Sequence, residues 1–156
     1  MDVLVKLGEH GKAADIYALP ISDLRAYNNL ILRRAAAAGN LNVMIALRVR
    51  GLRMRDARAL GCEALRAAVA NGDIEMISHL RHAWLAKLDD LRIYGGLYGG
   101  LTNGSIETAV YLYRWGVTPE DIRDTIKMRD LQELIFAGHS HVAEYLSRWI
   151  RRGSPY

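Results

Sequence analysis

The fold is indicated by one stretch of sequence, residues 65–80, which reads LRAAVANGDIEMISHL. Its first half is rich in alanine, the residue with the highest helix propensity. Gly72 then interrupts the pattern, and glycine readily takes the left-handed conformation in which helices end. In the second half Ile74, Ile77 and Leu80 recur at three-residue intervals, which favours an amphipathic helix. The stretch therefore predicts two short helices joined by a glycine turn.

The same pattern occurs four times along the chain. The glycine before the second helix recurs at nearly equal spacing, at Gly39, Gly72, Gly104 and Gly138. A leucine lies seven residues before each glycine and another lies eight residues after it, at Leu32, Leu65, Leu97 and Leu131 and at Leu47, Leu80, Leu112 and Leu146. The last three copies add a tryptophan, at Trp84, Trp115 and Trp149. Agreement at this many positions identifies an internal repeat of about 33 residues.

A second landmark precedes each helix pair. It is the motif Asp-x-Arg, which occurs at Asp23–Arg25, Asp56–Arg58, Asp90–Arg92 and Asp121–Arg123. In the last copy Thr118 and Pro119 are typical of a helix start, so each repeat is predicted to begin with a short leading helix and not with a β-hairpin. The regular recurrence of the motif favours a structural role, in which each arginine binds a neighbouring repeat.

The frame of glycines and leucines resembles the ankyrin repeat, whose period is also about 33 residues. Residues 35–44 and 67–76 are similar to the inner helix, turn and outer helix of that family. Residues 111–121 are similar to the divergent ankyrin-like repeats that are abundant in giant DNA viruses and amoebae. The family's Thr-Pro-Leu-His signature is absent. The resemblance covers residues from about 21 to 150, and it implies a binding role without transferable site residues.

We therefore expect an all-α, ankyrin-like helical solenoid of four units, with a short leading helix replacing the β-hairpin of the family. The predicted units cover residues of about 21–53, 54–87, 88–118 and 119–152. Residues 1–20 are expected to form an N-terminal helical cap, because a terminal repeat must be shielded on its apolar face. Residues 153–156 are expected to form a flexible tail.

Composition indicates the compartment. The chain of 156 residues has one cysteine, Cys62, which excludes an internal disulfide and fits a reducing environment. No signal peptide is apparent at the start of the sequence. No stretch approaches the roughly 20 apolar residues of a membrane span. We expect an intracellular protein, cytoplasmic or nuclear (in a host cell if it is viral), with no membrane partner.

Residues suited to catalysis or metal binding form no recognisable pattern. His79 and His82 lie three residues apart, but a zinc site needs further cysteine or histidine ligands at metal spacing. The glycines within residues 95–100 match neither a phosphate loop nor a dinucleotide motif. They indicate close helix packing, with a flexible joint as the alternative. We expect no enzymatic activity, no metal and no cofactor.

The best candidate for a binding site is an arginine-rich segment. Five arginines and one acid lie between residues 48 and 58, so the segment alone sums to +4, the net charge of the whole chain. An acidic protein is favoured as the partner over nucleic acid, because no aromatic residue that could stack on bases lies within the segment. A solvated face without a ligand is an equal alternative. The predicted face comprises Arg33, Arg34, Arg48, Arg50, Arg53 and Arg55.

Tyrosines of the third repeat form a second candidate, at Tyr94 and Tyr98, because tyrosine is enriched at binding hot spots. The repeated tryptophans are interpreted as core residues. The sequence therefore predicts a non-catalytic protein–protein interaction module or scaffold that binds a macromolecular partner through the repeat surface. Two alternatives remain: a structural component that self-associates or packs into a shell, and a basic adaptor on nucleic acid.

Overall fold

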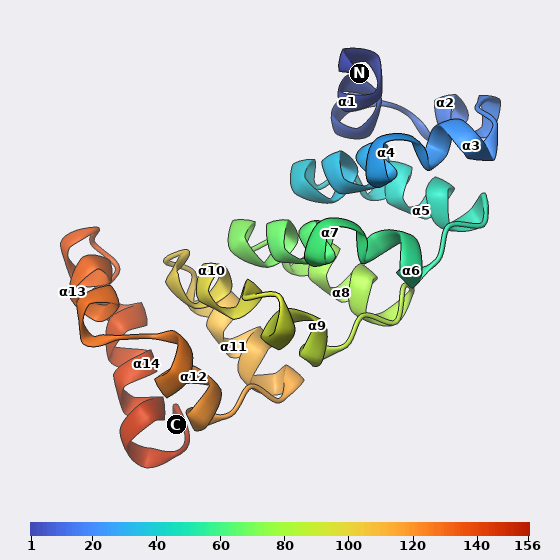
Figure 1. Ribbon diagram of the computed structural model, residues 1–156. Coiled ribbons are helices and arrows are strands. Elements are labelled where there is room, and N and C mark those ends of the chain that lie inside the picture. Colours follow the sequence, from blue (N-terminus) through green and yellow to red (C-terminus); the bar gives the residue numbers. More distant parts are fainter.

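The computed structural model describes residues 1–156 and contains fourteen helices and no strand (Figure 1), which confirms the prediction of an all-α protein. The helices are α1 (Asp2–His10), α2 (Ala13–Ala18), α3 (Ile21–Leu24), α4 (Ala26–Ala38), α5 (Leu41–Val49), α6 (Met54–Ala57), α7 (Ala59–Asn71), α8 (Ile74–His82), α9 (Leu88–Ile93), α10 (Gly96–Thr102), α11 (Ile106–Trp115), α12 (Pro119–Thr125), α13 (Met128–Phe136) and α14 (Ser140–Arg152).

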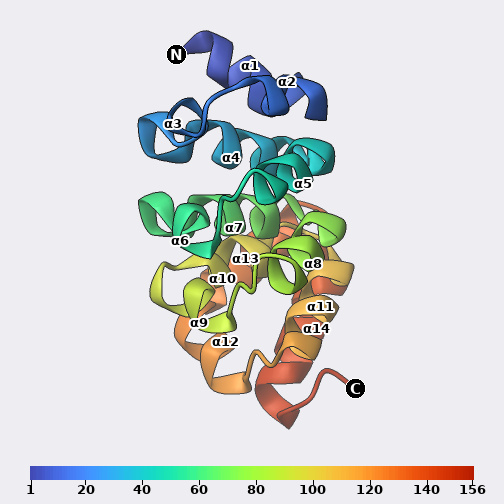
Figure 2. The same cartoon turned by 90° about the vertical axis from the view of Figure 1, so that its right-hand side faces the viewer.

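The helices repeat in a fixed order along the chain. A short leading helix is followed by an inner helix and an outer helix, in the four sets α3–α5, α6–α8, α9–α11 and α12–α14. Helices α1 and α2 precede them and pack on α4 and α5. Figure 1 shows these sets following one another from the N-terminus to the C-terminus, and Figure 2 shows the leading helices along one edge.

Local sequence explains how each inner helix is joined to its outer helix. Gly39 and Gly72 have φ angles of 71° and 69°, a left-handed conformation that glycine adopts without steric cost. The outer helix begins directly after this turn. There the side chains of Asn40 and Asp73 accept hydrogen bonds from backbone N–H groups three residues further on. The turn therefore returns the chain alongside the helix it has just left.

All eight repeated leucines are buried, within one continuous cluster of 37 buried residues. Trp84 and Trp149 are fully buried as well, whereas Trp115 is half-buried. Each set is only one helix pair thick, so these side chains are covered by the neighbouring sets. Burial of a leucine side chain contributes roughly 1.5–3 kcal/mol, which makes the contact between sets the main source of stability.

The glycines of α10 allow that helix to approach α7 closely. A Cβ atom added at Gly100 would overlap the Val69 side chain, and one added at Gly96 would lie 2.9 Å from Cγ of Arg66. At Gly99 the distance to the Cβ of Ala70 would be 3.0 Å. These contacts agree with close helix packing, the favoured interpretation of the glycine-rich stretch.

The last set departs from this regular stacking. Helices α1, α4, α7 and α10 pack in succession, but α13 packs mainly on α14. A cavity of about 270 Å³ lies between α10 and α13, with Tyr98 and Thr102 on one side and Asp130 and Leu134 on the other. Figure 1 shows the last set turned relative to the three sets before it.

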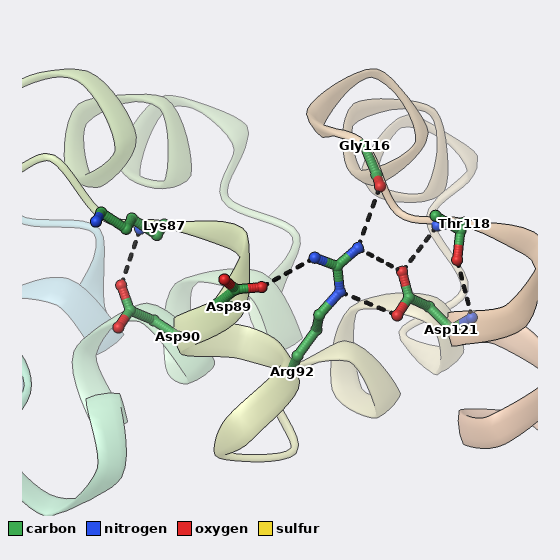
Figure 3. A network of polar contacts seen from close by, with 7 residues as sticks. All are labelled: Lys87, Asp89, Asp90, Arg92, Gly116, Thr118 and Asp121. Carbon is green, nitrogen blue, oxygen red and sulfur yellow. Dashed lines mark hydrogen bonds and ion pairs between the residues drawn. The ribbon is translucent and has the colours of Figure 1, made fainter.

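An aspartate–arginine ladder runs along the leading helices. The Nε atom of each arginine donates to the aspartate of the next set at 3.0 Å, in the pairs Arg25–Asp56, Arg58–Asp90 and Arg92–Asp121. Each of these aspartates also accepts a hydrogen bond from the backbone N–H at the start of its own helix. Figure 3 shows the last pair, in which Arg92 also donates to Asp89 and to the carbonyl oxygen of Gly116. The structure thus contains the inter-repeat contacts predicted from the Asp-x-Arg motif.

The ladder stops at both ends of the repeat array for visible reasons. No preceding set supplies an arginine to Asp23. Asp23 also lacks the backbone hydrogen bond that the other aspartates accept, because the residue three positions before it is Pro20, which has no N–H group. At the other end Arg123 donates to Glu120 on its own helix and to the carbonyl oxygen of Ile150. Within the ladder, the hydrogen bond from Arg92 holds the pKa of the Asp121 carboxyl below its usual value.

The C-terminal tail, residues 153–156, contacts the last two helix pairs. Pro155 is buried, whereas Gly153 and Tyr156 are exposed. The ring of Tyr156 lies edge-on to those of Tyr113 and Tyr145, with centroid separations of 5.7 and 6.4 Å. Aromatic pairs of this geometry contribute about 0.5–1.5 kcal/mol beyond their buried area, so the tail is held against α11 and α14.

The ladder can be tested by replacing Arg58 with methionine, which keeps the aliphatic stem and removes the guanidinium. We expect the Arg58→Met variant to lose about 1–2 kcal/mol of unfolding free energy in urea denaturation, because Asp90 is buried and loses its charged partner. The matched control is Arg55→Met on α6, three residues before Arg58, since Arg55 is exposed and makes no hydrogen bond or ion pair. Equal stability of the two variants would contradict a structural role for the ladder.

The close approach of α10 and α7 predicts that Gly100→Ala is destabilising by about 1–3 kcal/mol, because the added methyl group overlaps Val69 and crowds Leu112. Gly99→Ala serves as the comparison. There the weaker contact with Ala70 is offset by a gain in helix propensity of about 1 kcal/mol. Thermal unfolding measures both changes, and a stabilised Gly100→Ala variant would favour the flexible joint instead.

Candidate functional site

The arginine-rich segment is largely engaged within the stack. Arg48 donates from Nε to the carbonyl oxygen of Ala83 at 3.1 Å, and its guanidinium lies 5.9 Å from the ring centre of Trp84. Arg50 donates to the carbonyl oxygen of Leu19. Arg53 donates to the carbonyl oxygens of Arg48 and Leu52, at 3.2 and 3.0 Å. These guanidinium groups satisfy carbonyl groups at helix ends, where cations are stabilised by the helix dipole.

The structure does not bring Arg33 into a common surface with these residues. Its side chain is only 9% exposed, and it forms an ion pair with Glu63 at 2.7 Å. The prediction that Arg33 belongs to an exposed basic face is therefore wrong, because the guanidinium is used inside the protein. Arg34 is exposed and lies 3.9 Å from Glu9 of α1. Of the predicted basic residues, Arg55 is exposed and without a hydrogen-bonded partner.

Two unusual turns join the leading helices to the inner helices. Residues 27–29 and residues 60–62 each have three successive left-handed backbone conformations, with φ between 51° and 64°. This conformation costs non-glycine residues roughly 1–2 kcal/mol each, so it needs support from the surroundings. An arginine supplies that support in each case. Arg33 donates to the carbonyl oxygens of residues 27 and 28, and Arg66 to those of residues 60 and 61.

Large apolar side chains are exposed to solvent at these two turns and at the end of α9 in the third set. Tyr27, Leu60 and Ile93 are 61%, 52% and 72% exposed, and they recur at the period of the repeat. Tyr94, one residue further on, is 43% exposed. We call the four residues Tyr27, Leu60, Ile93 and Tyr94 the turn ridge. Tyr27 and Leu60 lie in the first turns of α4 and α7, directly after the leading helices α3 and α6, which Figure 2 shows with α9 along one edge of the stack.

The turn ridge was missed by the sequence analysis except for Tyr94. A signal was present, since Tyr27, Leu60 and Ile93 recur every 33 residues, each shortly after a ladder arginine. Their exposure could not be read from that spacing, because the equivalent residue of the fourth set, Ile126, is buried. The ridge therefore extends over three sets and stops where the last set turns away.

The other predicted tyrosine, Tyr98, lies beside the cavity between α10 and α13. Its hydroxyl donates to Oδ1 of Asp130 at 3.1 Å. This hydrogen bond raises the pKa of the Tyr98 hydroxyl. Tyr98 occupies the repeat position of Arg33 and Arg66, and like Arg33 it reaches from an inner helix to the following set. The half-exposed ring remains accessible from the cavity.

The outer helices are joined by a second row of contacts. The residue after the second repeated leucine meets the tryptophan of the next set, in the pairs Arg48–Trp84, Arg81–Trp115 and Tyr113–Trp149, with separations of 5.9, 5.2 and 5.1 Å. The first two are cation–π contacts and the third is an edge-to-face aromatic pair. The tryptophans and Tyr113 therefore serve the stack and not an exposed surface.

The titratable groups offer no nucleophile or metal cluster. Burial raises the pKa of the Cys62 thiol to about 11, so the thiol stays protonated at neutral pH. Burial lowers the pKa of His79, whose Nε2 accepts a hydrogen bond from the Trp84 indole at 3.1 Å. No three His, Cys, Asp or Glu side chains are grouped so as to hold a metal ion.

None of the fourteen helices combines the length and the apolar character required to cross a bilayer. Comparison of the chain with models of protein families, with curated proteins and with solved structures gives no significant match. The function is therefore inferred from the geometry of the surface.

The partial burial of His79 predicts a pH dependence of stability. Because the pKa of His79 is lowered in the folded state, the unfolded chain binds a proton more readily, and stability is lost as pH falls below about 6.5. We expect the melting temperature of the wild-type protein to fall more between pH 7.5 and 5.5 than that of His79→Gln, which keeps an acceptor but cannot titrate. Identical pH profiles for the two proteins would show that His79 is not coupled to folding.

Proposed function

We propose that the chain is an ankyrin-like helical solenoid, and that it acts as a non-catalytic protein-interaction module whose contact surface is the turn ridge. The observation that carries this proposal is the row of exposed apolar side chains that follow the leading helices of three successive sets. Large exposed apolar residues that line up across several elements are typical of protein-binding surfaces. Aromatic residues such as Tyr27 and Tyr94 are the kind that dominate binding energy.

The assignment to ankyrin-like solenoids is supported by the order of elements within each set. An inner helix, a glycine turn and an outer helix recur at the period of the sequence repeat, and the sets share one core. A leading helix of four to seven residues stands in place of a hairpin. The divergent repeats of giant DNA viruses and amoebae are the proposed relatives, and the proposed site of action is the interior of a cell, in the cytoplasm or the nucleus.

The backbone beneath the turn ridge supports a binding role in a second way. The left-handed turns at Tyr27 and Leu60 are held by Arg33 and Arg66, so these side chains project from a backbone that is fixed before any partner arrives. Preorganised side chains lose little conformational entropy on binding, which raises affinity. Strained backbone that is actively supported by its surroundings is also typical of functional segments.

The electrostatics favour an apolar contact over a strongly basic one. The ladder arginines near the turn ridge are each paired with an aspartate, and three arginines of the arginine-rich segment bind backbone carbonyl groups. The arrangement therefore offers few unpaired cations to an acidic protein or to phosphates. Arg55 and Arg34 remain exposed, so attraction to acidic groups of a partner makes only a minor contribution to binding.

The proposal is tested by affinity capture from native lysate, with and without nuclease, comparing the wild type with the double variant Leu60→Asn/Ile93→Ser. Asparagine tolerates the left-handed backbone of residue 60. We expect at least about tenfold lower recovery of the protein partner, because hot-spot residues each contribute more than about 1 kcal/mol.

A matched control keeps the interpretation specific. Leu85 also has a left-handed backbone and is 67% exposed, and Val49 is exposed to the same extent, but both lie on other elements. The variant Val49→Ser/Leu85→Asn should recover the partner at the wild-type level. If only this control loses the partner, the binding site does not lie on the turn ridge. The same conclusion follows if only a quadruple serine variant of Arg48, Arg50, Arg53 and Arg55 loses it. A partner that disappears with nuclease would favour the nucleic-acid alternative.

A further inference from the structure

The cavity between α10 and α13 contains a buried carboxylate that no cation of the chain neutralises. Four charged side chains belong to residues that are at most 8% exposed, namely Arg33, Asp56, Asp90 and Asp130. The arginine and the first two aspartates each form an ion pair with a residue of another set. Asp130 is the least exposed of the four and forms no ion pair. Because a buried charge without a partner of opposite charge is costly, Asp130 needs an explanation.

Asp130 has the same local setting as the aspartates of the ladder. Its Oδ2 atom accepts a hydrogen bond from the backbone N–H three residues before it at 2.7 Å, as that of Asp90 does at 2.8 Å (Figure 3). The other oxygen of Asp90 accepts from the guanidinium of Arg58 at 3.0 Å. On Asp130 that second oxygen accepts only from the neutral hydroxyl of Tyr98, at 3.1 Å. Asp130 is therefore oriented like a ladder aspartate but lacks the guanidinium.

The repeat shows why the chain supplies no cation here. The position of Tyr98 is an arginine in both preceding sets, Arg33 and Arg66. Arg33 donates from Nη1 to the carboxylate of Glu63 in the following set, at 2.7 Å. A tyrosine at this position offers no charge to the set that follows. The last set thus presents a carboxylate to an interface from which the arginine has been replaced.

The space beside this carboxylate is polar and reachable from solvent. The cavity measures about 270 Å³, just below the roughly 300–1,000 Å³ of pockets for drug-sized ligands, so it suits a group the size of a side chain. Glu133 adds a second carboxylate, and its contact with Arg129 at 3.5 Å joins two exposed side chains. Tyr98, Thr102 and His139 also line the cavity. No lysine or arginine is among the lining residues.

We propose that this cavity binds a guanidinium group, as carried by an arginine side chain, through the carboxylate of Asp130 and the ring of Tyr98. A carboxylate has about four lone-pair positions, and the two hydrogen bonds to Asp130 leave about two of them free. A guanidinium donates in a planar fork that matches a carboxylate and stacks on aromatic rings, whereas an ammonium is a compact, strongly hydrated charge. The buried aspartates of the ladder are held by guanidinium groups in the same way. The inference does not depend on the turn ridge.

The electrostatics of the cavity agree with a cationic ligand. Two carboxylates and no basic side chain of lysine or arginine face the same space, so an anion would be repelled from it. The hydrogen bond to Asp130 and the charge of that carboxylate raise the pKa of the Tyr98 hydroxyl, so the phenol stays protonated. The face of a tyrosine ring attracts cations, and the ring of Tyr98 is 44% exposed and open to an incoming group.

An NMR titration of the full chain tests the proposal directly. The probe is N-acetyl-arginine amide, whose one charge is the guanidinium, and the titration is run at pH 8 to keep histidine side chains neutral. The probe should cause saturable shifts of backbone amide signals within residues 98–102 and 130–139. The citrulline analogue has nearly the same shape without the charge and should cause none. The lysine analogue should bind at least about tenfold more weakly, because an ammonium cannot form the fork.

The variant Asp130→Asn keeps an acceptor at the start of α13 and removes the charge. It should lower the affinity for the arginine probe at least about tenfold, as expected for the loss of a charge-assisted hydrogen bond. The matched control is Asp15→Asn. Asp15 also accepts a hydrogen bond from the backbone N–H three residues before it, at 2.8 Å, but it is exposed and lies on α2. This control should bind the probe like the wild type.

The variant Tyr98→Arg separates ligand binding from damage to the fold. It restores the arginine of the preceding sets, so the chain itself supplies a guanidinium to Asp130. We expect this variant to lose binding of the arginine probe and to melt at a higher temperature than the wild type. A Tyr98→Arg protein that still binds the probe, or that is no more stable than the wild type, would overturn the proposal.

Two sources of the guanidinium are distinguished by a second pair of probes, free L-arginine and the peptide acetyl-Gly-Gly-Arg-Gly-Gly-amide. If the peptide binds at least as tightly as free L-arginine, the ligand is an arginine of a partner protein. Tighter binding of free L-arginine assigns the cavity to a small molecule instead. The proposal is wrong if no arginine probe causes saturable shifts, if the citrulline or lysine analogue binds equally well, or if Asp130→Asn binds like the wild type.

Discussion

A single pair of short helices cannot bury its own apolar side, and the rest of this structure follows from that constraint. The repeated leucines become buried only when the next set lies on top of them, so each set depends on its neighbours. The pair α1 and α2 meets the same need for the first complete set, since it covers α4 and α5. At the far end α13 and α14 leave that need unmet, which is why an apolar groove remains there.

Apolar burial alone would not fix how the sets are aligned, because leucine contacts tolerate sliding. Two rows of directional contacts supply the alignment. The aspartate–arginine ladder links successive leading helices, and the contacts of Arg48, Arg81 and Tyr113 with tryptophans link successive outer helices. Many of the chain's arginines are consequently engaged by carboxylates, carbonyl groups and aromatic rings of the protein itself. A basic segment in the sequence thus need not produce a basic surface.

The proposed functions reside where the repeat is irregular. The left-handed turns expose Tyr27 and Leu60, whereas an ordinary helical continuation would direct those positions differently. In the fourth set Ile126 is buried, and the ridge ends. The same set is turned relative to the others, so α13 leaves a cavity next to Tyr98 on one side and an exposed face with Phe136 on the other. Regular positions hold the stack together, and irregular ones are available to partners.

The sequence by itself determined the helical class, the period of the repeat, the glycine turns and the pairing of Asp-x-Arg motifs between sets. Each of these is set by local propensity or by spacing along the chain, and both can be read from the order of residues. Only the tertiary structure decided which polar and aromatic side chains are exposed. Arg33 looks like a surface cation and is buried against Glu63, and Tyr156 looks like part of a loose tail and packs on Tyr113. Exposure depends on what the neighbouring set places opposite a residue, and that neighbour is a full repeat away in the chain, beyond the reach of local patterns.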